Sequence, residues 1–186
     1  IDIMLVRDDD IPSFVADGAC DLGIVGSNVA EEDRLSGNRA MPLKVVRSLG
    51  FAKCRLALAA PAQRARNGVE GLAGARIATT YPRLTQSFLR SAGVEASTVV
   101  MNGSVEVAPR LKIADGVCDI VSTGATLEAN GLVVVANVFD SQAVLIAPDT
   151  AAPPGKQRVI DAFLKRIDGV LLSRDAKYVM MNAPRD

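Results

Sequence analysis

The sequence predicts an α/β fold in which a middle lobe is inserted into an outer lobe. Apolar runs typical of strands alternate along the chain with helix-like segments. Of the 186 residues, 49% are hydrophobic and only 4% are aromatic, so the apolar mass is mostly aliphatic and suits stacked α/β layers. Composition changes after Ala60 and again after Ala147, where two breaks interrupt the pattern.

These observations favour doubly wound, mostly parallel sheets. We expect residues 1–60 plus 148–186 to form the outer lobe and residues 61–147 to form the inserted lobe. Because the chain then crosses twice between lobes, we also expect a cleft between them, which is a favoured place for a ligand.

The strands are predicted from apolar or β-branched runs bounded by Gly, Pro, Asn or Asp. In chain order they cover residues 2–6, 21–25, 43–49, 53–60, 76–79, 97–101, 116–121, 132–138, 143–147 and 178–181.

The helices are predicted from their start and stop signals and from apolar periodicity. Asp10 is the expected N-cap of the first helix, with Pro12 in its first turn and Gly18 at its end. The last helix has Val159, Phe163 and other apolar residues at helical spacing. In order, the expected helices cover about residues 10–17, 28–35, 82–92, 105 onward, 126–130 and 156–174.

Charge and cysteine content narrow the class of protein. The chain has 21 basic and 21 acidic residues, so its formal net charge of zero gives no reason to expect a nucleic-acid or membrane partner. No signal peptide or membrane-spanning run is visible. Cys20, Cys54 and Cys118 each lie in an apolar segment, which favours reduced core thiols without a catalytic role in a cytoplasmic protein.

The sequence contains no histidine. This excludes a Ser-His-Asp triad, a Cys-His pair and a His-ligated zinc site. Chemistry must therefore use carboxylates, Arg or Lys, hydroxyls, backbone N–H groups or a hard metal ion.

Residues 116–131 form the most informative segment. An expected strand enters a small-residue turn that contains Ser122, Thr123, Gly124 and Thr126, and a short helix follows. Free N–H groups and the helix dipole favour an anion at such a turn, and Gly124 allows a ligand to approach the backbone closely. Asp119, just before the turn, could accept hydrogen bonds from ribose hydroxyls. We therefore expect a phosphorylated sugar; a well-capped βα turn without a ligand is the alternative. No Walker Gly-Lys-Ser/Thr follows.

Several stretches together resemble the ATP phosphoribosyltransferase family of histidine biosynthesis. They span nearly the whole chain in order, at residues 6–12, 21–26, 54–56, 76–82, 102–109 and 119–130. The resemblance implies a type II periplasmic-binding-protein-like fold. It also implies transfer of phosphoribosyl from phosphoribosyl pyrophosphate to N1 of ATP, with Mg²⁺ as cofactor. Adenine N1 is unprotonated at neutral pH, so the absence of histidine agrees with this reaction.

The resemblance also implies site residues. Ser122, Thr123, Gly124, Ala125 and Thr126 would hold the 5′-phosphate, and Asp119 and Glu106 would meet ribose hydroxyls. Arg7 would neutralise the leaving pyrophosphate, and the nucleotide pocket would include Asp21, Leu22, Gly23, Thr79 and Tyr81.

Each role has a structural alternative. Asp119 could cap the turn, Glu106 could complement a helix dipole, Arg7 could pair with Asp8 or Asp9, and Leu22 and Tyr81 could be core residues. The Mg²⁺ ligands are unknown: Asp8 and Asp9 could bind the ion through water, although a solvated cluster is favoured.

The ends of the chain differ from the family pattern. The chain lacks the expected first segment, and residues 177–184 look like the long-form branch, which continues into a regulatory domain. The resemblance implies a homo-oligomer, dimers built into a hexamer, or a regulatory subunit if the protein is of the short form. A non-catalytic binding module for a phosphorylated ligand and an inactive fragment are the alternatives.

Overall fold

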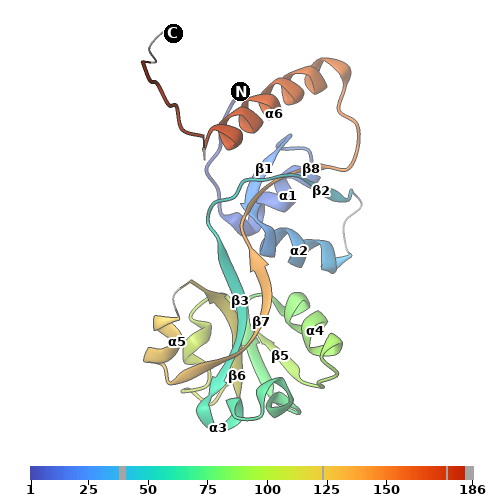
Figure 1. Cartoon of the computed structure of the whole chain (residues 1–186). Coiled ribbons are helices and arrows are strands. Elements are labelled where there is room, and N and C mark those ends of the chain that lie inside the picture. Colours follow the sequence, from blue (N-terminus) through green and yellow to red (C-terminus); the bar gives the residue numbers. More distant parts are fainter. Residues whose placement is uncertain (38–40, 123, 175, 183–186) are drawn as a thin grey trace. The chain divides into compact units, whose positions relative to one another are not determined.

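The computed structural model describes residues 1–37, 41–122, 124–174 and 176–182. The chain separates into two compact units, Ile1–Asp149 and Thr150–Asp186, and each is described by itself. The first unit contains a three-stranded and a five-stranded sheet (Figure 1). Among the described residues, no helix combines the length and the apolar character needed to cross a bilayer.

The middle strand of the three-stranded sheet comes from residues 143–148, which lie far along the chain from its two neighbours. Its order is β1 (Gly23–Gly26), β8 (Ala143–Pro148) and β2 (Leu43–Ser48), and both pairings are antiparallel. A 3₁₀ turn over Asp8–Asp10 leads into α1 (Ile11–Ala16), and α2 (Ser27–Ser36) follows β1. A Cβ at Gly23 would lie 2.5 Å from Ile11 Cγ2, so the close packing of α1 on β1 requires glycine there.

The five-stranded sheet mixes parallel and antiparallel pairs. Its order is β5 (Ser97–Val100), β4 (Arg76–Thr79), β6 (Gly116–Val121), β3 (Cys54–Pro61) and β7 (Leu132–Ser141). Strand β4 is parallel to β5 and β6, whereas β3 is antiparallel to β6 and β7. Helices α4 (Pro82–Ser91) and α5 (Ala125–Ala129) cover opposite faces of this sheet, and α3 (Ala62–Ala65) follows β3 (Figure 1).

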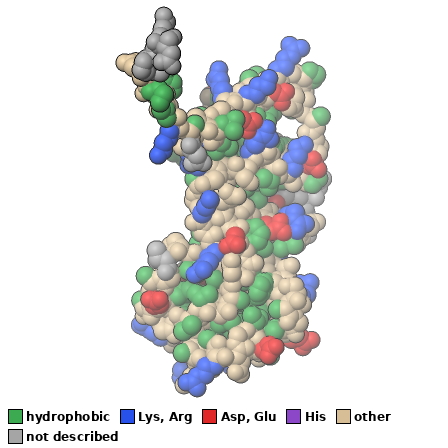
Figure 2. All heavy atoms as spheres, viewed as in Figure 1, with side chains coloured by type: hydrophobic (Ala, Val, Ile, Leu, Met, Phe, Trp, Pro, Cys, Tyr) green, Lys and Arg blue, Asp and Glu red, His purple; other side chains and the backbone are tan. Residues whose placement is uncertain are grey.

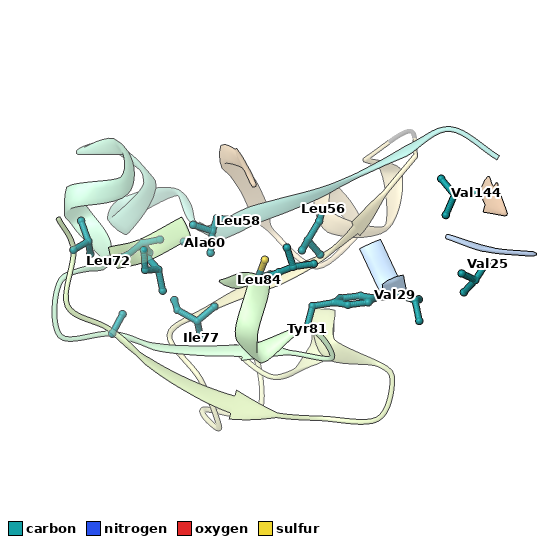
Figure 3. Packing of buried hydrophobic residues seen from close by; sticks show 14 of the residues in the cluster. Val25, Val29, Leu56, Leu58, Ala60, Leu72, Ile77, Tyr81, Leu84 and Val144 are labelled. Carbon is teal, nitrogen blue, oxygen red and sulfur yellow. The ribbon is translucent and has the colours of Figure 1, made fainter. Parts of the chain in front are cut away.

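Strand β3 divides the core of the first unit into two layers. Leu56 and Leu58 point to the face covered by α4, where they pack in one buried cluster with Leu84 (Figure 3). Ala57 and Ala59 point to the other face and belong to the cluster that includes Leu127 of α5. All four β3 side chains are fully buried, because alternate residues of a strand face opposite sides and both sides are covered.

The second unit contains α6 (Pro154–Ser173), which confirms the helix predicted for residues 156–174. The predicted strand over 178–181 is wrong: this segment is irregular and its four large side chains are exposed. The predicted strand over 2–6 is also wrong, since that segment has no strand geometry and Leu5 is 96% exposed. Apolar composition indicates a capacity for burial, but a strand also needs a paired neighbour, and composition does not supply one.

The α/β class is confirmed, but the sheets are not mostly parallel. Four of the six strand pairings between described residues are antiparallel. The error has a physical reason: side-chain periodicity reports which face a residue occupies and carries no information about the direction of the neighbouring strand.

The predicted division into lobes of residues 1–60 plus 148–186 and 61–147 stays a prediction. β3, at the end of the predicted outer-lobe range 1–60, lies in the five-stranded sheet with the strands of residues 61–147. β8, at the end of that second range, pairs with β1 and β2. The chain thus passes from one sheet to the other after β2 and again between Ser141 and Ala143.

Candidate functional site

The site predicted from the 116–131 segment lies at one edge of the five-stranded sheet. Strands β4, β5 and β6 run parallel, so their carboxyl ends, at Thr79, Val100 and Val121, meet at the same edge. Ligands of α/β proteins bind outside this edge, where the connecting turns are free to diverge from the sheet. Each of the three turns carries residues that the sequence analysis selected.

The turn after β6 is open to solvent. Gly124 is the N-cap of α5 and has φ of 87°, a left-handed conformation that favours glycine. Ser122, Ala125 and Thr126 are exposed. Asn130 Nδ2 donates to the backbone oxygen of Thr126 at 2.9 Å, which closes the short helix. Thr123 lies outside the described residues. The Ser122 and Thr126 side chains are therefore open to solvent, and the predicted binding of a phosphate at this turn stays a prediction.

Asp119 precedes this turn, and Glu106 lies near enough for its charge to affect the ionisation of Asp119. Asp119 is on β6, and its Oδ1 accepts a hydrogen bond from the backbone N–H of Ile120 at 2.8 Å. Glu106 comes from the 3₁₀ turn Val105–Val107 that follows β5. Burial raises the pKa of Asp119, and the nearby Glu106 charge raises it further, while the Ile120 hydrogen bond opposes both. Two neighbouring carboxylates suit a ligand that donates hydroxyl hydrogens.

Tyr81 lies in the turn after β4 and is 8% exposed. Thr79 holds this turn: its Oγ1 accepts from the Tyr81 N–H at 2.9 Å, and Thr85 Oγ1 donates to the Tyr81 carbonyl at 2.7 Å. Burial raises the pKa of Tyr81 to about 12, and the charges of Asp8 and Asp9 add to that effect. Asp9 of the 3₁₀ turn before α1 and Tyr81 of the β4 turn also line one pocket.

Thr79 itself is fully buried with its hydroxyl engaged. Its side chain positions the Tyr81 turn, and its predicted contact with a nucleotide stays a prediction. Asp21, Leu22 and Gly23 lie at the beginning of β1 in the other sheet, and Gly23 is explained by its packing against α1. Arg7 is exposed, and its carbonyl accepts from the Asp10 N–H at 3.1 Å.

We expect Tyr81 to ionise later than an ordinary tyrosine. The native state holds its phenol protonated above pH 10, where the unfolded chain ionises. The stability linked to Tyr81 is therefore complete below about pH 10 and lost as the pH rises towards about 12. An ultraviolet titration of the folded protein should show a phenolate step near pH 12 that Tyr81→Phe lacks. Tyr178 is present in both proteins and cancels in the difference; a step lost near pH 10 would contradict the burial described above.

A polar pocket that the sequence does not predict lies next to Tyr81. The pocket has a volume of about 320 Å³ and is lined by residues of the 3₁₀ turn before α1, of α1 and α2, and of the turn and helix that follow β4. Its charged lining residues are Asp9, Glu32, Asp33 and Arg83. No local pattern could have identified it, because Glu32 on α2 and Arg83 on α4 are separated by 51 residues and meet only in the folded chain.

The described part of the chain contains no group of three or more His, Cys, Asp or Glu side chains that could hold a metal ion. Mg²⁺ commonly keeps several waters and uses only one or two carboxylates together with substrate phosphates. The Asp119–Glu106 pair and the Asp8–Asp9 turn fit that mode better than a site made wholly of protein ligands. Both acidic and basic side chains occur on the face shown in Figure 2.

Comparison with known proteins gives one consistent family. The family model for ATP phosphoribosyltransferase (HisG) matches residues 7–169. A curated ATP phosphoribosyltransferase from Maricaulis maris is 50% identical over 186 residues, which cover all of this chain and 63% of that protein. The chain thus spans less than two thirds of the length of that relative.

Solved structures agree with this similarity. An ATP phosphoribosyl transferase (HisG:HisZ) complex from Thermotoga maritima has a TM-score of 0.73 at 26% identity, covering 90% of this chain and 78% of that one. A substrate binding protein of an amino acid ABC transporter has a TM-score of 0.59 at 8% identity, covering 90% and 70%. This second likeness concerns the fold alone, and it agrees with the periplasmic-binding-protein-like architecture predicted from the sequence.

Proposed function

The chain belongs to the ATP phosphoribosyltransferase family, and from this premise we propose that the protein transfers phosphoribosyl from phosphoribosyl pyrophosphate to N1 of ATP. The products are phosphoribosyl-ATP and pyrophosphate, in the first step of histidine biosynthesis. The observation that supports this most strongly is the edge where the 122–126 turn, Asp119 and Glu106 lie together. The turn offers hydrogen-bond donors to a phosphate, and the two carboxylates can accept hydrogen bonds from hydroxyls. Together they match a ribose 5-phosphate group.

In this proposal the protein acts by position and charge. The turn after β6 holds the 5′-phosphate with backbone N–H groups and the Ser122, Thr123 and Thr126 hydroxyls, while Asp119 and Glu106 accept from ribose hydroxyls. The anomeric carbon is thereby fixed for attack by adenine N1, which needs no general base. Tyr81 stays neutral and flanks the nucleotide, and Arg7 offsets charge on the leaving pyrophosphate.

We include Mg²⁺ as the cofactor in the proposal. When bound, the ion would neutralise pyrophosphate charge. Asp8, Asp9, Asp119 and Glu106 are the residues that would face it, directly or through water. Each supplies carboxylate oxygen, which is the ligand type that Mg²⁺ prefers.

The partners and the location also belong to the proposal. The similar Thermotoga maritima protein was solved as a HisG:HisZ complex. We propose either a homo-oligomer of dimers built into a hexamer or an assembly with a regulatory subunit. A cytoplasmic location is supported by the three free cysteines, Cys20, Cys54 and Cys118. Cys118 is fully buried, as predicted for a core thiol, whereas Cys20 and Cys54 are only partly buried, so the prediction of a core position is wrong for these two.

Binding of phosphoribosyl pyrophosphate with Mg²⁺, measured by calorimetry, tests the site. Loss of a hydrogen bond to a charged group costs about 1.5–3 kcal/mol, so Thr126→Ala should weaken binding roughly 10- to 100-fold. Thr98→Ala removes a hydroxyl from within β5, and we expect it to leave binding unchanged.

Pyrophosphate release in the presence of ATP tests the reaction. Release that requires both substrates supports the transferase. Saturable binding without release would support the alternative of a non-catalytic binding module, which the family match does not favour. Binding that is equal in wild type and Thr126→Ala would contradict the assignment of the 122–126 turn.

A further inference from the structure

The Glu32 side chain lies at the N-terminus of α4. Its Oε1 accepts from the Arg83 backbone N–H at 2.9 Å, and its Oε2 accepts from the Leu84 N–H at 2.8 Å. Arg83 Nη1 lies 3.4 Å from Oε1 and completes the contact. The Glu32 side chain is only 12% exposed, so these bonds form largely out of water.

Helix α4 has no cap of its own. Its N-cap residue, Tyr81, makes no side-chain hydrogen bond to the first turn. The first N–H groups of a helix need acceptors, and a negative charge is stabilised there by the helix dipole. Glu32 therefore supplies, from a helix distant in sequence, the cap that the local sequence of α4 lacks.

The contact joins parts of the first unit that belong to different sheets. Helix α2 follows β1 of the three-stranded sheet, and α4 follows β4 of the five-stranded sheet. At its N-terminal end α2 is held by Ser141, the last residue of β7: Ser141 Oγ donates to Asn28 Oδ1 at 2.6 Å and accepts from the Asn28 N–H at 3.1 Å. Between these contacts, Val29 lies against Tyr81 (Figure 3).

The Asn28 contact and the Glu32 contact differ in position. Asn28 bonds at the place where the chain crosses from one sheet to the other, between Ser141 and Ala143. Glu32 lies one helical turn further along α2, away from the crossing. It contacts Arg83 and Leu84, in the first turn of α4.

We propose that Glu32 is a positioning residue, which holds α2 against the start of α4 and thereby keeps the β4–α4 turn, with Tyr81, in place at the carboxyl edge of the five-stranded sheet. The choice of ligand in the following test rests on the proposed function. Glu32 touches no reacting atom in this proposal; it acts through the placement of the β4–α4 turn. In the free protein the β4–α4 turn then already has the position that it needs to bind the ligand. We call this position the binding arrangement, and no free energy of binding is used to form it.

Removing the contact should lower the fraction of molecules in that arrangement. The apparent dissociation constant increases by the inverse of the competent fraction, so a fall in that fraction to about one tenth weakens binding about tenfold. Molecules that do bind recover the arrangement, so we expect kcat to change by less than about twofold while KM rises about tenfold.

The test compares Glu32→Ala with Glu31→Ala in the full-chain protein. Glu31 is the adjacent residue of α2 and pairs with Arg34 of the same helix, at 2.7 Å from Nε. Its removal therefore controls for loss of a carboxylate and of helix stability. Glu32→Gln, which keeps one acceptor and the side-chain size, is the milder second variant, and we expect an intermediate effect.

Two readouts need no ligand. Amide hydrogen exchange at Arg83 and Leu84 should become at least about tenfold faster in Glu32→Ala, because both N–H groups lose their acceptor, and should not change in Glu31→Ala. The phenol titration of Tyr81 should move from near pH 12 towards pH 10 only in the Glu32 variants, as the turn becomes exposed. Unchanged exchange or an unchanged titration would overturn the positioning role.

The third readout uses phosphoribosyl pyrophosphate with Mg²⁺. An increase in KM with little change in kcat supports positioning, whereas equal KM values for Glu32→Ala and wild type would overturn it. If wild-type protein neither binds nor turns over this substrate, the proposed function fails, and the two ligand-free readouts still decide whether Glu32 holds the Tyr81 turn.

Discussion

Replacing Gly124 by valine is expected to lower kcat/KM for the proposed phosphoribosyl transfer by at least about a hundredfold, because a small displacement of a bound reactant has effects of that size. Gly124 has φ of 87°, and a β-branched residue is strongly disfavoured there. Among the described residues, and leaving out its neighbours in the chain, a Cβ at this position would come no nearer than 4.0 Å to another atom, which is Val121 Cγ1. The expected loss therefore comes from backbone strain and from obstruction of the ligand, and crowding within the protein contributes little.

Gly124→Asn provides the matched comparison. Asparagine adopts the left-handed conformation more readily than other non-glycine residues, so the turn should keep its shape and lose less activity than with valine. Steady-state kinetics and calorimetry with phosphoribosyl pyrophosphate measure both variants. If Gly124→Val binds this substrate as tightly as wild type, the 5′-phosphate does not lie at the turn after β6.

Replacing Leu58 by alanine is expected to destabilise the protein by about 2–5 kcal/mol, the usual cost of a large-to-small change in a packed core. Leu58 is fully buried on β3, which has a strand on each side in the five-stranded sheet. Such a loss is a large part of the about 5–15 kcal/mol that stabilises a typical domain. Urea unfolding followed by circular dichroism gives the free-energy difference.

Val133→Ala on the neighbouring strand β7 is the control. Val133 pairs with Ala60 of β3 but is 48% exposed, so its truncation should cost less than about 1 kcal/mol. Equal effects of the two substitutions would contradict the buried position of β3 in the core. Separate unfolding transitions for the two sheets would show that the first unit does not unfold as one cooperative body.

The part of the site that lies within one short segment could be predicted from the sequence. The run over 116–121, the turn and the short helix appear in the structure as β6, the left-handed Gly124 and α5. The physical cues are local: an apolar run, a glycine, hydroxyl residues and a following helix. Asp119 is a candidate because it directly precedes that turn, and the ribose-binding roles of Asp119 and Glu106 stay predictions.

Features that depend on pairing between distant segments could not be predicted. The apolar residues at 2–6 fit a strand pattern, yet the segment forms none in the structure. The direction of β3 relative to β6 leaves no trace in periodicity, so the sheets were expected to be mostly parallel. Glu32 is one of two adjacent glutamates on a polar helix, and nothing nearby distinguishes it from Glu31 until α4 is placed against α2.

The position of β8 has a consequence for the order in which the protein is made. β1 and β2 pair with opposite edges of β8, so they are not neighbours in the sheet. During synthesis, residues 23–26 and 43–48 therefore have no partner from their own sheet until residues 143–148 leave the ribosome. The five-stranded sheet is already complete once β7 has been made, at residue 141. Closing a loop of this length carries an entropic cost, and the assembled five-stranded sheet lowers that cost by bringing the ends of β3 and β7 together.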